Sequence, residues 1–150
     1  MADRKDLALA AERFLAVSGQ TYTVDEETGN FLIDFPLEDE EDGVLRSLLA
    51  VRDGGYDYAI PLPVPCEEDC LREAALLAAA VNHRMPAGRI DLDIESGQMT
   101  YLAGLEAETP PAYEKLESLV LAGQALMKAL AGPLTRVGQG LSEAMDELNQ

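Results

Sequence analysis

The sequence predicts an α+β protein: a twisted antiparallel sheet of about five or six strands with helices packed on it, in the order α-β-β-β-β-α-β-β-α. Two kinds of pattern predict it. Residues 71–81 are Ala-rich and carry apolar residues at helical spacing. Apolar residues alternate with polar ones on both sides of Thr28-Gly29, Asp53-Gly54 and Ser96-Gly97, and each pair suits a tight turn. A length of 150 residues is enough for one domain, which we expect to span 1–150.

The first helix is predicted to begin after Asp3, which can cap it, and to end at Ser18-Gly19. Its predicted apolar face consists of Leu7, Ala10, Phe14 and Val17.

Two hairpins are predicted next. With Thr28-Gly29 as the loop of the first, Val24 opposes Ile33 and Tyr22 opposes Phe35. The second turns at Asp53-Gly54 and shares one apolar face across both strands, formed by Leu45, Leu49, Val51, Tyr56, Tyr58, Ile60 and Leu62.

Pro61, Pro63 and Pro65 alternate at the end of this hairpin and remove backbone donors along one edge. We therefore expect that end to be an outer strand or to leave the sheet. The acidic run 38–42 before Gly43 is predicted to be a solvated loop. A calcium loop fails, because its twelfth position would be Leu49 instead of a bidentate Glu.

The helix of residues 71–81 presents a face of Leu71, Ala74, Leu77, Ala78 and Val81. In the hairpin that follows, a two-residue Ser96-Gly97 loop pairs Ile94 with Met99, Leu92 with Tyr101 and Ile90 with Ala103. Asp91, Asp93 and Glu95 then lie on the opposite face. A slip of one residue would bury these acids, so the faces are well specified.

A long helix is predicted after Thr109-Pro110-Pro111, with a stripe of Tyr113, Leu116, Val120, Met127 and Leu130. Gly132-Pro133 is expected to break or kink it. The last segment spaces its apolar residues as a narrow helical seam: Leu134, Val137, Leu141, Met145 and Leu148. The seam is a possible dimer or client contact, and packing within the chain is an equal alternative.

The composition is strongly acidic, with 28 acids, 11 bases and a net charge of −17. Direct binding to nucleic acid or to an anionic membrane is therefore not expected, whereas a basic protein segment would be complementary. No leader peptide or apolar stretch of about 20 residues is evident, so we expect a cytoplasmic protein. Cys66 and Cys70 are expected to be reduced.

No set of residues predicts catalysis, a metal or a cofactor. His83 is the only histidine, and at a helix end it suits the helix dipole without further function. Cys66 and Cys70 supply two metal ligands at most, and no phosphate-binding glycine motif follows a strand.

Five short stretches of the chain have a familiar wording, and they lie in 31–35, 58–65, 81–83, 88–93 and 96–101. On these residues the chain resembles the YbjN-like family of proposed bacterial sensory-transduction regulators. The family shares its fold with type III secretion chaperones. The resemblance implies a sheet covered by helices, frequent homodimers, and binding of other proteins rather than catalysis.

The sequence and the resemblance together suggest a non-enzymatic protein-binding module, chaperone-like or regulatory, which holds a client protein. The alternative is a small-molecule sensor with a pocket lined by Tyr56, Tyr58 and Tyr101. An acidic mimic of nucleic acid is a third possibility.

Overall fold

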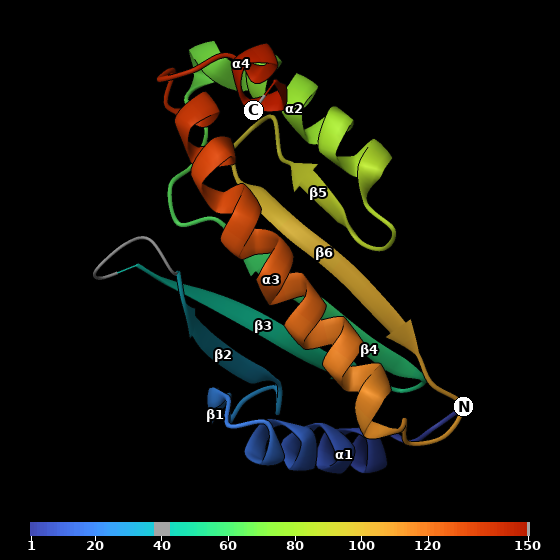
Figure 1. Cartoon of the computed structure of the whole chain (residues 1–150). Coiled ribbons are helices and arrows are strands. Elements are labelled where there is room, and N and C mark those ends of the chain that lie inside the picture. The colour runs from blue at the N-terminus through green and yellow to red at the C-terminus, as the bar shows by residue number, and fades with distance from the viewer. Residues whose placement is uncertain (38–42, 150) are drawn as a thin grey trace.

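The computed structural model describes residues 1–37 and 43–149, so the predicted acidic loop at 38–42 lies outside the described residues. Figure 1 shows the elements. Their bounds are α1 (Arg4–Val17), β1 (Thr21–Val24), β2 (Phe31–Pro36), β3 (Val44–Arg52), β4 (Gly55–Pro61), the 3₁₀ turn η1 (Glu68–Cys70), α2 (Leu71–Arg84), β5 (Arg89–Leu92), β6 (Met99–Glu106), α3 (Tyr113–Gly138) and α4 (Ala144–Leu148). The predicted α+β class and order of elements are confirmed, with η1 and α4 added.

The six strands form one antiparallel sheet in the order β1-β2-β3-β4-β6-β5. Buried and exposed residues alternate along β2, β3 and β4, as expected for a sheet with one covered face. The covered face packs against the helices, and α3 crosses it diagonally (Figure 1). The other face carries ion pairs of Arg46 with Asp34 and of Arg52 with Asp57 and Glu106.

The β3–β4 hairpin has the predicted register. Val51 pairs with Tyr56 and Leu49 with Tyr58 around the two-residue Asp53-Gly54 loop, and all four apolar side chains are buried. This type of turn fixes the register because its short loop leaves no other pairing.

The other two hairpins are displaced by two residues from the predicted registers. Tyr22 pairs with Ile33 and Val24 with Phe31, while Leu92 pairs with Met99 and Ile90 with Tyr101. The displaced registers make five predicted pairings wrong: Val24 with Ile33, Tyr22 with Phe35, Leu92 with Tyr101, Ile90 with Ala103 and Ile94 with Met99. A shift of two keeps each side chain on its face, so Leu92 and Tyr101 still share the covered side. Ile94 belongs to the loop and is 71% exposed.

The same six-residue turn causes both displacements. In each, the amide of a loop-opening aspartate donates to a carbonyl five residues later: Asp25 to Asn30 and Asp93 to Gln98. Gly29 and Gly97 donate back to these aspartates and have φ near +75° and +79°. Glycine adopts this left-handed conformation without the steric cost of a side chain.

The structure confirms Asp3 as the cap of α1, since its carboxylate accepts from the Lys5 amide. The buried face is Leu7, Ala11, Phe14 and Leu15. Val17 is 76% exposed, so its predicted place on the apolar face is wrong, and Ala10 is only partly buried. The face of α2 is as predicted: Ala74, Leu77 and Ala78 are buried, and Leu71 and Val81 pack against them.

The predicted break at Gly132-Pro133 is wrong, because α3 continues through Pro133 to Gly138. An interior proline costs roughly 3 kcal/mol. Beyond it, Leu134 and Val137 are each 99% buried, and this burial offsets the cost. The chain turns at Gly140, whose φ is +76°, and then forms the five-residue helix α4.

The proline-rich segment leaves the sheet on the β3 side. Hydrogen-bonded pairing of β3 with β4 ends at Leu48 and Ala59, and Pro61 begins the divergence. On its other side this segment still pairs, since the Leu62 amide donates to Met99. The predicted exit of this end from the sheet is therefore confirmed for the β3 side alone.

Candidate protein-binding surface

The three tyrosines proposed for a ligand pocket lie in the core. Tyr56 and Tyr58 are fully buried, and Tyr101 is 3% exposed. The Tyr56 hydroxyl donates to the Leu7 carbonyl at 2.6 Å. Burial raises the pKa of Tyr58 to about 12. Tyr101 also borders an open depression along α3, but the predicted pocket shared by all three is filled by the protein itself.

A buried polar network explains the position of Tyr58. Ser47 donates to the Ile33 carbonyl at 2.9 Å, so the Tyr58 hydroxyl donates to Ser47 Oγ at 2.7 Å. Gln124 Nε2 in turn donates to Tyr58 at 3.2 Å and to Gln20 at 3.0 Å. The network joins β3, β4 and α3 and is a structural element of the core.

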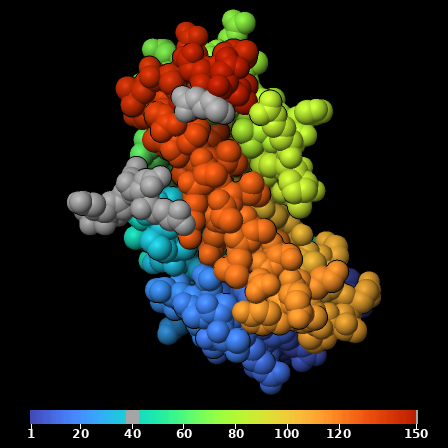
Figure 2. All heavy atoms as spheres, in the orientation of Figure 1, coloured from blue at the N-terminus to red at the C-terminus, as the bar shows by residue number. Residues whose placement is uncertain are grey.

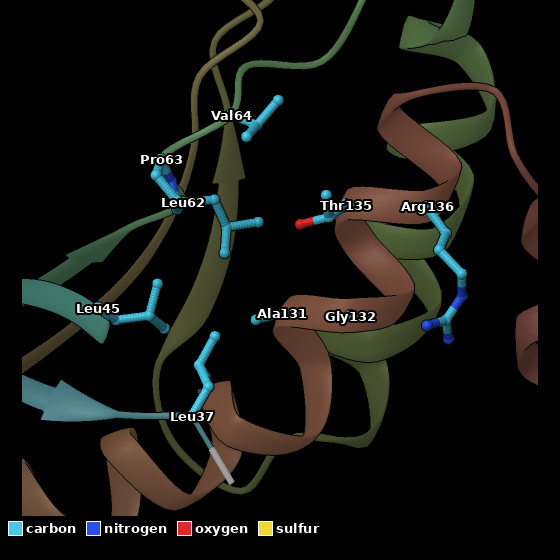
Figure 3. Close-up of a pocket in the computed structure, with 9 residues that line it drawn as sticks. All are labelled: Leu37, Leu45, Leu62, Pro63, Val64, Ala131, Gly132, Thr135 and Arg136. Carbon is cyan, nitrogen blue, oxygen red and sulfur yellow. The ribbon is translucent and has the colours of Figure 1, made fainter. Parts of the chain in front are cut away.

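One pocket lies where β3 and β4 diverge, and we call it the sheet-break pocket. Its volume is about 310 Å³, and its apolar lining includes Leu37, Leu45, Leu62, Val64 and Ala131, with Thr135 beside them. Figure 3 shows Leu45 and Leu62 facing α3 across this space, with Arg136 at its outer side. The pocket exists because the prolines turn the chain away from β3.

A longer depression follows the opposite flank of α3, and we call it the α3 groove. It consists of two adjoining pockets of about 280 and 330 Å³, which share Pro86 and Leu126. α2 and β6 form its other wall. Figure 2 shows α2, in green to yellow-green, beside α3, in orange, on this face of the molecule. Its largest apolar residues include Leu77, Val81, Leu105, Leu119, Leu126 and Leu130.

The five residues of the predicted C-terminal seam fall into two groups, one in α3 and one beyond it. Leu134 and Val137 lie in α3 and are buried within the chain. Leu141 is 76% exposed, Met145 in α4 is 62% exposed, and Leu148 lines the end of the α3 groove. The continuous helical seam is therefore wrong, because the turn at Gly140 separates its two halves.

The helices beside the groove differ in charge from the rest of the chain. α2 carries two bases and one acid, and α3 carries three bases and two acids. Together they carry +2, which leaves −19 for the remainder of a chain with net charge −17. Arg84 and Lys115 line the groove, and neither has a carboxylate within 4 Å among the described residues.

Glu147 also lines the groove, but its charge is neutralised. Arg136 donates to its two carboxylate oxygens through Nε at 2.9 Å and Nη2 at 2.8 Å, and Ser142 donates to it at 2.5 Å. These hydrogen bonds, led by that of Arg136, lower the pKa of Glu147 to about 2. The groove therefore presents free positive charge.

The other residues considered for chemistry lie apart from the groove's apolar lining. His83 is exposed in the last turn of α2. Cys66 and Cys70 are free thiols, and burial raises the pKa of Cys66, assisted by nearby Cys70 and Glu67. In the part of the chain that the structure describes, no three His, Cys, Asp or Glu side chains gather as a metal site. None of the described helices has the length and apolar composition needed to cross a membrane.

No protein-family model and no curated protein sequence matches the chain. Among solved structures it is similar to the crystal structure of "YbjN, a putative transcription regulator from E. coli". The TM-score is 0.62 over 86% of this chain and 90% of that one, at 13% identity. The chain has a YbjN-like fold.

Two motifs behind the sequence resemblance to the YbjN-like family meet in space. The Asn82 side chain forms two hydrogen bonds with the backbone of Ile90, at 2.6 and 3.0 Å, along the outer edge of β5. A Cβ on Gly88 would lie 2.7 Å from the Tyr101 hydroxyl oxygen, so this position requires glycine. In this chain both motifs therefore stabilise the YbjN-like fold.

Sequence reasoning missed the α3 groove. Its α2 and α3 walls come from residues about 30 to 55 positions apart, and the sequence alone gives no distance between them. The available signal was the small, mostly apolar flank of α3, on which Ala122 and Leu126 lie one turn apart.

Proposed function

We propose that this protein is a non-enzymatic regulatory module that acts by binding another protein chain. The open apolar α3 groove is the observation that carries the proposal. Large apolar depressions on soluble proteins frequently mark interaction sites. The description of YbjN as "a putative transcription regulator" supports a regulatory role, and the chaperone-like fold of the resembling family supports binding of a client.

Affinity capture from the native host tests this function. Ala122 is an exposed residue that lines the groove, whereas Ala125 is exposed on α3 outside it. Ala122→Trp would fill the groove, and Ala125→Trp adds the same side chain to the neighbouring surface. We expect partners captured by the wild type and by Ala125→Trp to be lost with Ala122→Trp. Equal capture by both variants would contradict a role for the groove.

Self-association is a separate part of the proposal. Leu141 and Met145 are the two seam residues most exposed to solvent, and a second copy would cover them in a homodimer. Light scattering of wild type and of Leu141→Ser/Met145→Ser measures this directly. We expect a dimer that becomes a monomer in the double variant, and a monomeric wild type would contradict the proposed dimer.

A small-molecule sensor is the second candidate, and the sheet-break pocket favours it. Its volume of about 310 Å³ falls at the lower end of known ligand sites, and most of its lining is apolar. A thermal-shift screen of metabolites would identify a ligand. Thr135→Phe should block the pocket and abolish the shift, and a shift that survives this change would place the ligand elsewhere.

A further inference from the structure

We infer that the α3 groove binds an amphipathic helix whose polar flank is acidic. The inference rests on the proposed protein-binding function and adds the conformation and charge of the bound segment.

The dimensions of the groove fit a helix. Along α3 it extends from Lys115 to Pro133, a separation of 18 residues or about 27 Å of helix. A partner helix of about 18 residues would match this length and place apolar residues into the groove at every third or fourth position. Exposed Pro86, Ser118 and Ala122 leave the groove open along its side. A small apolar ligand would usually be more than 70% enclosed.

The charged side chains beside the groove favour a partner helix of negative charge. Arg84 comes from the last turn of α2, and Lys115 from the first turn of α3. Both are exposed and unneutralised among the described residues, whereas Glu147 is bound by Arg136 and Ser142. Acidic residues on the flank of a bound helix would therefore meet positive charge. Such pairs mainly fix orientation and specificity.

The net charge of the whole chain would favour a basic partner instead. A net charge of −17 attracts basic segments from a distance, which is the partner expected from composition. At physiological salt, however, charges separated by more than about 8 Å are largely screened. Contact specificity at the groove then depends on Arg84 and Lys115, and this makes the two expectations separable by experiment.

The test uses a fluorescent, helix-stapled 18-residue peptide with Leu at positions 1, 4, 8, 11, 15 and 18 and with Glu and Ala elsewhere. The control peptide has Lys in place of every Glu. Binding to the full chain at physiological salt is measured by anisotropy, and methyl NMR shifts of Leu126 and Leu130 locate the site. We expect the Glu peptide to bind at the groove at least tenfold more tightly than the Lys peptide does.

Charge-reversal variants provide the matched control. Arg84→Glu/Lys115→Glu should weaken the Glu peptide at least tenfold. Lys128→Glu changes an exposed cation on the other flank of α3 and should change its affinity less than twofold. If Lys128→Glu weakens the Glu peptide as much, per charge reversed, as the double variant does, binding depends on net charge and the inference is overturned. Tighter binding of the Lys peptide at the groove would also overturn it. Unfolding curves of each variant confirm folding.

The outcomes also separate this inference from the proposed function. If Ala122→Trp abolishes partner capture but the Glu peptide does not bind, the groove binds a protein of another kind and the acidic-helix inference is wrong. If the Glu peptide binds and no partner depends on Ala122, the function is wrong while the recognition chemistry holds.

Discussion

Gln124 Nε2 donates a hydrogen bond to the Tyr58 hydroxyl across 3.2 Å, and this contact ties α3 to the centre of the sheet. Both residues are at least 95% buried. The position of α3 determines both the groove and the sheet-break pocket, because the helix forms one wall of each.

Tyr58→Phe should lower the free energy of unfolding by about 1–2 kcal/mol, because Ser47 and Gln124 each lose a buried partner. Urea unfolding measures this change. Tyr113→Phe is the control, since Tyr113 is 38% exposed and should tolerate the loss of its hydroxyl. An equal effect of the two substitutions would show that the network contributes little.

Gly123→Ala should destabilise the protein by about 1–3 kcal/mol through overpacking. The new Cβ would lie 2.9 Å from Tyr101 and 3.3 Å from Tyr58, both rigid rings in the core. Gly132→Ala is the matched control on the same helix, where the Cβ meets only the guanidinium of Arg136, at 3.2 Å, and no core ring. It should be neutral or stabilising by up to about 1 kcal/mol. The reverse order of the two unfolding midpoints would contradict the packing of α3 on the tyrosines.

Asn82→Ala should lower stability by about 1–2 kcal/mol and increase hydrogen exchange at the Ile90 amide, because two hydrogen bonds to the edge of β5 are lost. Asn82→Asp keeps the acceptor for the Ile90 amide and should protect it more than Ala does. Unchanged exchange at Ile90 in the Ala variant would contradict this account of the edge.

The pairing of Glu147 with Arg136 should make part of the stability pH-dependent. The folded pKa of Glu147 is lowered to about 2, below its usual value near 4.5. Its contribution is therefore present above about pH 4.5 and is lost as the pH falls toward 2. The stability difference between wild type and Glu147→Gln should be larger at pH 6 than at pH 3. A difference that is independent of pH would contradict the ion pair.

Local patterns predicted the elements well where one interaction dominates. Asp53-Gly54 allowed a single two-residue loop, so the register of β3 and β4 was predictable. At Thr28-Gly29 and Ser96-Gly97, the carboxylates of Asp25 and Asp93 accept hydrogen bonds from loop amides, and the loop has six residues instead of two. The alternation of side chains was still correct, because both registers place the same residues on the covered face.

Long-range packing decided what the sequence could not show. Pro133 predicts a helix break, but the burial of Leu134 and Val137 depends on neighbours elsewhere in the chain. The tyrosines suggested a pocket, but Gln124 and Gly123 bring α3 onto them. The same placement of α3 leaves the groove open at Ala122, which is 17 positions from Leu105, its nearest groove residue on β6.

Site-specific photo-cross-linking tests most directly whether the α3 groove is the partner-binding surface. Benzoylphenylalanine is placed at position 122 in one variant and at position 125 in the other, and both are irradiated in cells of the native host. We predict a dominant covalent adduct with another protein from position 122 and little from position 125. Equal adducts from both positions, or none from position 122, would contradict the account.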